Sequence, residues 1–170
     1  MRGFPQARVI SVDSSKEATL FEMLETYFFS LGVINSLFLI LIFLIRKTRL
    51  DLIEKFGWTY LLLMIPALVG IFLSVRGNIS IQYIVFLAIF LAFLFFEWLL
   101  DYALKIDFRE NMKKHLKWVI PYLALYYMMN YGFIVMPWKT SMIWGIVMLG
   151  LFIIQIIANL RSHPKITKET

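Results

Sequence analysis

Cysteine is absent from this sequence, and charged residues occupy only 16% of its 170 positions. Without Cys, the chain can form neither a disulfide scaffold nor a thiolate site for catalysis or metal binding. The charged fraction lies well below the roughly 25% of soluble domains, which excludes an ordinary soluble enzyme. A phosphate-binding Gly-rich loop, HExxH and GxSxG are also missing. We therefore expect no cofactor and no metal ion.

Long apolar runs dominate what is present, because 61% of the residues are hydrophobic. A helix needs about 20 mostly apolar residues to cross a hydrocarbon core of about 30 Å. Five stretches approach or reach that length: Tyr27–Ile45, Trp58–Val75, Ile79–Leu100, Trp118–Trp138 and Ser141–Leu160. The sequence therefore predicts an all-α, polytopic integral membrane protein that folds as a five-transmembrane-helix bundle. The second stretch is the weakest, since it contains Pro66 and Gly70.

We expect three regions along the chain. Residues 1–24 form an extracytoplasmic tail, residues 25–160 the five-helix transmembrane domain, and residues 161–170 a cytoplasmic tail. Within the first region, residues 1–12 show no helical pattern, whereas Ser14 and Glu17 have the spacing of a capping box. A short amphipathic helix is predicted to begin at Ser14 and either to lie on the outer surface or to run into the first span.

Lys and Arg indicate the orientation, because cytoplasmic loops of membrane proteins carry an excess of both. With the amino terminus outside, twelve of the 17 Lys and Arg residues fall in cytoplasmic segments and five fall outside. We therefore predict a multi-pass protein of the cell membrane with its amino terminus outside and its carboxyl terminus in the cytoplasm. The basic inner segments predict contact between the protein and anionic lipids at the inner face of the bilayer, and no binding of nucleic acid.

Polar side chains inside the spans are the candidates for function, because each costs free energy in lipid and tends to face the protein interior. At about 1.5 Å per residue, Asn35 and Asn130 lie about 12 Å below the outer boundary. Glu97 lies about 24 Å and Gln155 about 21 Å below it. The sequence therefore predicts an outer layer of two Asn side chains and an inner layer of Glu97 and Gln155.

Glu97 and Asp101 are four residues apart, which places both carboxylates on one face of a regular helix. One interpretation is a pair that handles protons or cations at the cytoplasmic mouth of the bundle. The alternative is structural, with Asp101 paired to Lys105 and Glu97 paired to a loop lysine. A divalent-cation site that adds His115 is too unspecific a pattern to support a metal assignment.

The fourth span is unusually rich in Tyr. Tyr122, Tyr126 and Tyr127, together with Asn130 and Tyr131, cover about half of the helix circumference at 100° per residue. Such a stripe could line a cavity for a ligand with an apolar body and a few polar atoms. It could equally supply hydrogen bonds that hold helices together.

Three functions remain open on the sequence alone. The first is transport or binding of a small solute, ion or lipid-like ligand through an intramembrane polar cleft. Its ligand-binding residues would be Asn35, Glu97, Asp101, Tyr126, Tyr127, Asn130, Tyr131 and Gln155. The second is a membrane-embedded enzyme that acts on a lipid at the cytoplasmic interface, although no catalytic residue can be named. The third is a non-catalytic accessory or scaffold subunit. A homo-oligomer or a complex with another membrane protein is compatible with each.

Overall fold

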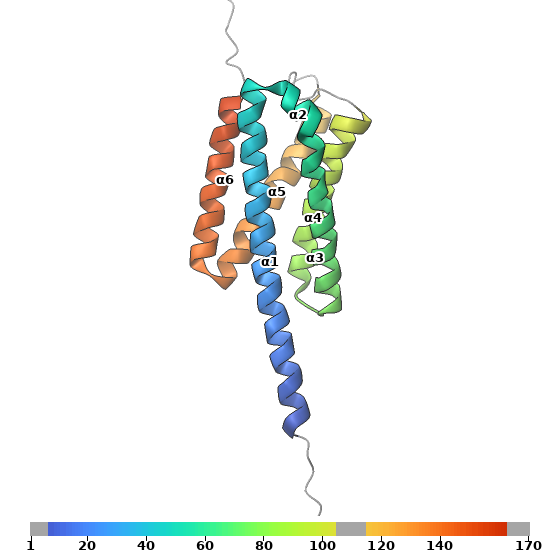
Figure 1. The fold of residues 1–170 in the computed structure, drawn as a ribbon, viewed down its shortest axis with the longest axis vertical. Coiled ribbons are helices and arrows are strands. Elements are labelled where there is room, and N and C mark those ends of the chain that lie inside the picture. Colours follow the sequence, from blue (N-terminus) through green and yellow to red (C-terminus); the bar gives the residue numbers. More distant parts are fainter. Residues whose placement is uncertain (1–6, 105–114, 163–170) are drawn as a thin grey trace, which may run out of the picture.

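The computed structural model describes residues 7–104 and 115–162, and these form helices joined by short connections (Figure 1). No strand occurs among the described residues. In chain order the elements are α1 (Ala7–Thr48), α2 (Leu50–Phe56), the 3₁₀ helix η1 (Gly57–Leu63), α3 (Met64–Arg76), α4 (Ile81–Trp98), the π-helical segment η2 (Leu99–Ala103), α5 (Leu116–Thr140) and α6 (Met142–Ser162).

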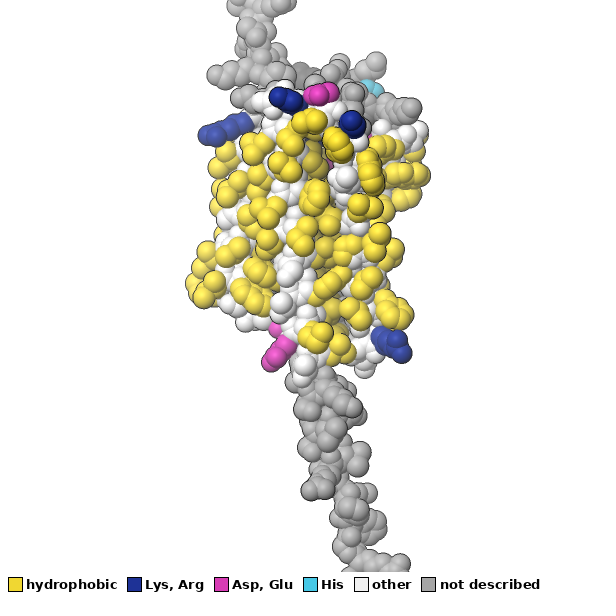
Figure 2. All heavy atoms as spheres, viewed as in Figure 1, with side chains coloured by type: hydrophobic (Ala, Val, Ile, Leu, Met, Phe, Trp, Pro, Cys, Tyr) yellow, Lys and Arg dark blue, Asp and Glu magenta, His cyan; other side chains and the backbone are white. Residues whose placement is uncertain are grey.

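Five helical stretches are long and apolar enough to cross a membrane, which confirms the predicted all-α polytopic bundle. They are Thr19–Arg46, Gly57–Arg76, Ile81–Ala103, Leu116–Thr140 and Met142–Ser162. Charged side chains gather at the two ends of the bundle, and a broad apolar band separates them (Figure 2). This distribution is the one that a bilayer requires, with apolar side chains in the hydrocarbon region and charges at the interfaces. The chain is a multi-pass membrane protein.

Helix α1 is longer than expected and projects beyond the other helices (Figure 1). It begins at Ala7, seven residues before the predicted start at Ser14, and it continues without interruption into the first span. No Gly or Pro occurs between Ala7 and Leu31, so no residue in this stretch has the backbone properties that end a helix. The part of residues 1–12 that the structure describes is therefore helical rather than a loop.

The second span combines two helix types. It starts as the 3₁₀ helix η1 and becomes α-helical at Met64, two residues before Pro66. Pro66 thus lies in the first turn of α3, where backbone N–H groups have no partner within an α-helix. The Tyr27 hydroxyl of α1 donates a hydrogen bond to the Pro66 carbonyl oxygen at 2.7 Å. The proline is therefore accommodated without loss of the span.

The core of the bundle is aromatic, and two glycines allow helices to approach closely. Phe28, Phe90 and Phe133 are fully buried, and the Phe133 ring lies 5.1 Å from that of Phe28 and 5.2 Å from that of Phe90. A Cβ atom at Gly132 would meet the Phe86 ring at 2.3 Å, and one at Gly32 would meet the Phe133 ring at 2.8 Å. Helix α5 therefore packs tightly against α4 on one side and α1 on the other.

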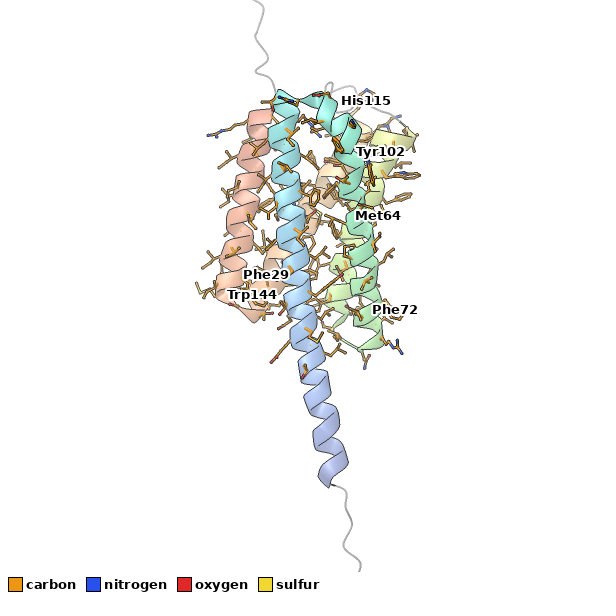
Figure 3. All side chains as sticks on the ribbon, viewed as in Figure 1. Phe29, Met64, Phe72, Tyr102, His115 and Trp144 are labelled. Atoms are coloured by element: carbon orange, nitrogen blue, oxygen red, sulfur yellow. The ribbon has the colours of Figure 1, made fainter. Side chains whose placement is uncertain are left out.

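Helices α1 and α6 lie side by side and run in the same direction. The rings of Phe29 and Trp144 stack at 4.6 Å where the two helices meet (Figure 3). One turn further along, the Gly32 position faces Met148. This register places Leu39 of α1 at the level of Gln155 of α6, and Ser36 about one turn from it.

Candidate functional site

Each of the five spans contributes at least one polar side chain to the buried interior. These side chains are Asn35 from α1, Tyr60 from η1, Glu97 from α4, Tyr122 and Tyr126 from α5, and Gln155 from α6. We call these six residues the polar cluster. Hydrogen bonds between them join the first span to the second, the third to the fourth, and the fourth to the fifth.

Glu97 is the charged member of the polar cluster. It follows Phe90, Phe93 and Leu94 on the buried face of α4, and only 9% of its surface is exposed. The Tyr122 hydroxyl donates a hydrogen bond to Glu97 Oε1 at 2.8 Å. A hydrogen bond to a carboxylate is one of the stronger types in proteins. The helix geometry thus holds an ionisable group inside the bundle.

Asn35 and Tyr60 form the second pair. The Tyr60 hydroxyl donates to Asn35 Oδ1 at 2.7 Å, and Asn35 Nδ2 lies 3.8 Å from the Met129 sulfur. Tyr60 was missed in the sequence, because a Tyr two residues after Trp58 at the edge of a span is typical of an interfacial aromatic belt.

Tyr126 and Gln155 form the third pair. The Tyr126 hydroxyl donates to Gln155 Oε1 at 3.0 Å, and Gln155 has no exposed surface. The other amide atom, Gln155 Nε2, is buried and has no hydrogen-bond partner within the described part of the chain, and the same holds for the Ser36 hydroxyl oxygen. Buried polar atoms are normally paired, so two unpaired ones on the adjacent helices α1 and α6 indicate that a further polar group belongs there.

The predicted Asn layer is not held by a bond between its two members. Asn130 is buried, but its Nδ2 donates to the Tyr126 carbonyl oxygen of its own helix at 2.9 Å. Asn35 is bonded to Tyr60 instead. Glu97 and Gln155, the predicted inner layer, are likewise bonded to different tyrosines, Tyr122 and Tyr126. The tyrosines of α5 thus connect these groups.

Three predicted site residues face away from the polar cluster. Tyr127 and Tyr131 are 53% and 61% exposed on the outer surface of α5, whereas Tyr126 is 4% exposed. Asp101 is also exposed. It lies in the π-helical segment η2, beyond the end of α4, which carries Glu97 on its buried face. Lys105, its predicted partner, lies outside the described residues.

Aromatic rings surround Glu97 and its neighbours. The Phe93 ring lies 5.5 Å from that of Tyr122 and 6.0 Å from that of Tyr126, and the Phe38 ring lies 6.1 Å from that of Tyr60. His115 lies at the same end of the bundle as α2 (Figure 3). Over residues 7–104 and 115–162, no three His, Cys, Asp or Glu side chains come together in a way that could hold a metal ion. The polar cluster is therefore a single carboxylate among hydroxyls, amides and aromatic faces.

A second set of polar contacts closes the opposite end of the bundle. Glu25 Oε1 of α1 accepts hydrogen bonds from Thr140 Oγ1 at 2.7 Å and from the Tyr83 hydroxyl at 3.3 Å. Beside them, Lys139 Nζ donates to Gln82 Oε1 at 2.7 Å. These contacts join α1, α4 and α5. They escaped sequence reasoning because each residue alone resembles an ordinary polar residue at the end of a span.

Residues 57–167 match the family described as YwiC-like protein. The match covers more than half of the chain, so the chain belongs to this family. It includes the second to fifth spans, and with them every member of the polar cluster except Asn35. No match was found among curated proteins or among solved structures.

Proposed function

We propose that this member of the YwiC-like family binds and transports a small solute or ion through the polar cluster, with Glu97 as the charge centre. One observation carries the proposal: all five spans direct a polar side chain into the interior around a buried, hydrogen-bonded carboxylate. Ionisable residues inside membrane bundles are costly, and they commonly mark solute and ion pathways. A carboxylate selects positive charge, so the expected solute is a cation or a protonated molecule.

The remaining sequence predictions complete the proposal. Arg46, Arg49, Lys55, Lys117 and Arg161 lie at the α2 end of the bundle, the end to which Glu97 is nearer. Under the positive-inside rule this end faces the cytoplasm, the amino terminus lies outside, and the protein resides in the cell membrane. The same basic residues would contact anionic lipid head groups. The solute would therefore meet Glu97 after a short path from the cytoplasm.

The test uses charge movement in a reconstituted system. Purified protein is placed in vesicles made of equal parts phosphatidylethanolamine and phosphatidylglycerol, which are adsorbed on a solid-supported membrane. Rapid jumps of methylammonium, sodium or proton concentration are applied. Because a cation that enters a buried site moves charge across part of the bilayer, the wild type should give a transient current with at least one of these probes.

Glu97→Gln keeps the shape of the side chain and should abolish the current. Glu22→Gln is the matched control, since Glu22 is an exposed carboxylate at the far end of α1's span, and it should leave the current intact. A wild type that is silent with every probe, or a Glu97→Gln variant with a normal current, would overturn the proposal.

One observation favours the accessory-subunit alternative. Tyr127 and Tyr131 present their rings and hydroxyls on the outer surface of α5, where they could contact another membrane protein or a second copy of this chain. Under this alternative, replacing both tyrosines by Phe, or both by Leu, should change co-purification or oligomer size. Glu97→Gln should leave assembly unchanged. The lipid-enzyme alternative receives no comparable support from the described residues.

A further inference from the structure

The unpaired amide nitrogen of Gln155 constrains the chemistry of the solute. Gln155 Nε2 is a buried hydrogen-bond donor that lacks a partner among residues 7–104 and 115–162, and it belongs to a side chain already bonded to the polar cluster. An unmet buried donor costs free energy of desolvation, and a hydrogen-bond acceptor placed there removes that cost. The atom that completes the site at Gln155 is therefore an acceptor, and a bare cation would be repelled by the amide hydrogens.

Glu97 requires a positively charged group rather than an acceptor, and it lies about one helical turn from Gln155. Tyr122 and Tyr126 are four residues apart on α5, which corresponds to roughly 6 Å along the helix. The first donates to Glu97 and the second to Gln155. The rings of Phe93, Tyr122 and Tyr126 pack against one another beside these two bonds, and aromatic faces attract organic ammonium groups.

From these contacts we propose that Gln155 is a ligand-binding residue and that the solute is a small organic cation. Its ammonium group lies against Glu97, and an oxygen acceptor about one helical turn away accepts a hydrogen bond from Gln155 Nε2. This inference rests on the proposed function and narrows its substrate class from any cation to an amine that carries an ether, carbonyl or hydroxyl oxygen. The Ser36 hydroxyl, which also lacks a partner among the described residues, lies on the adjacent helix α1 about one turn from the level of Gln155.

Two isosteric amines test the inference. In 4-methoxybutylamine an ether oxygen replaces one CH₂ of n-hexylamine, and its nitrogen and oxygen are about one helical turn apart. The thermal unfolding midpoint of the purified protein is measured against the concentration of each amine, because a ligand that binds the folded state raises it. The wild type should bind the amino ether about fivefold more tightly than the alkylamine, the effect of one added hydrogen bond.

The advantage of the oxygen should vanish in Gln155→Met and persist in the control Gln82→Met, whose glutamine lies at the opposite end of the bundle. If Gln155→Met is too unstable to measure, Gln155→Leu also removes the donor and places an apolar side chain of similar size there. In the shorter pair, 2-methoxyethylamine and n-butylamine, the oxygen should confer no advantage, because it cannot reach Gln155. Glu97→Gln should weaken both members of the longer pair equally.

Equal binding of the two longer amines by the wild type, or an oxygen advantage that survives in both Gln155 variants, would overturn the inference. Failure of both longer amines to stabilise the protein would overturn it as well. A sodium or proton current that depends on Glu97 would leave the proposed function standing in that case. Loss of the current together with loss of amine binding would remove both.

Discussion

Replacing Gly132 by Ala should destabilise the bundle, because an added Cβ atom at this position of α5 would clash with Phe86 of α4. A Cβ atom there would lie 2.3 Å from Phe86 Cδ1, 2.6 Å from Cγ and 3.0 Å from Cβ, whereas ordinary contacts begin near 3.4 Å. Rotation of the ring moves Cδ1 and Cγ but leaves the Phe86 Cβ at 3.0 Å, so the two helices must also shift apart by a few tenths of an ångström. Overpacking of this kind costs about 1–3 kcal/mol.

Gly150→Ala is the matched control, since an added Cβ there meets nothing within 4 Å. It should be neutral or stabilising by up to about 1 kcal/mol, the helix propensity that Ala gains over Gly. Unfolding of both variants is followed by Trp fluorescence in mixed detergent micelles, and the free energies are compared. If Gly132→Ala were as stable as Gly150→Ala, the close packing of α4 on α5 would be wrong, and with it the geometry that brings Tyr122 to Glu97.

Two further predictions concern the ends of the bundle. Glu25→Ala removes the acceptor shared by Thr140 and Tyr83, and it should lower the free energy of unfolding by about 1–2 kcal/mol. It should also raise amide hydrogen exchange in the turn after Thr140, as measured by mass spectrometry. Unchanged exchange would contradict a role of Glu25 in holding α1 to that turn. Because the chain has no Cys, Lys139→Cys should react with a membrane-impermeant maleimide added to intact cells, whereas Lys165→Cys should react only after lysis; the reverse pattern would invert the orientation.

The number and positions of the spans could be predicted from the sequence because the bilayer imposes a length and a composition on every crossing helix. The predicted ends of the second to fifth spans differ from those in the structure by one to three residues. The start of α1 could not be predicted in the same way, since the helix continues into water, where the apolar criterion no longer applies. The capping-box pattern at Ser14 lies within this continuous helix.

The inward face of each span could not be predicted, and Tyr126 and Tyr127 show why. These adjacent residues have the same side chain, yet one is 4% exposed and the other 53%. In a soluble helix, the contrast between apolar and polar faces would separate them, but lipid is as apolar as the protein core, so the contrast is lost. Glu97 and Gln155 could be singled out because polarity inside a span is itself a signal, whereas Tyr60 could not, because Tyr is common at interfaces.

Binding of a ligand to the polar cluster should change the stability of the bundle by a measurable amount. Its three bonds join neighbouring spans in sequence, and each such bond contributes about 0.6 kcal/mol on average inside a membrane. Together the three bonds contribute roughly 2 kcal/mol. A ligand that forms hydrogen bonds with the same side chains can replace this contribution. Because helices in lipid are not driven together by the hydrophobic effect, a ligand bound among five spans would contribute directly to their association. Binding at Glu97 and Gln155 should therefore stabilise the whole bundle, whereas a ligand adsorbed on the outer surface of α5 would leave the packing between spans unchanged.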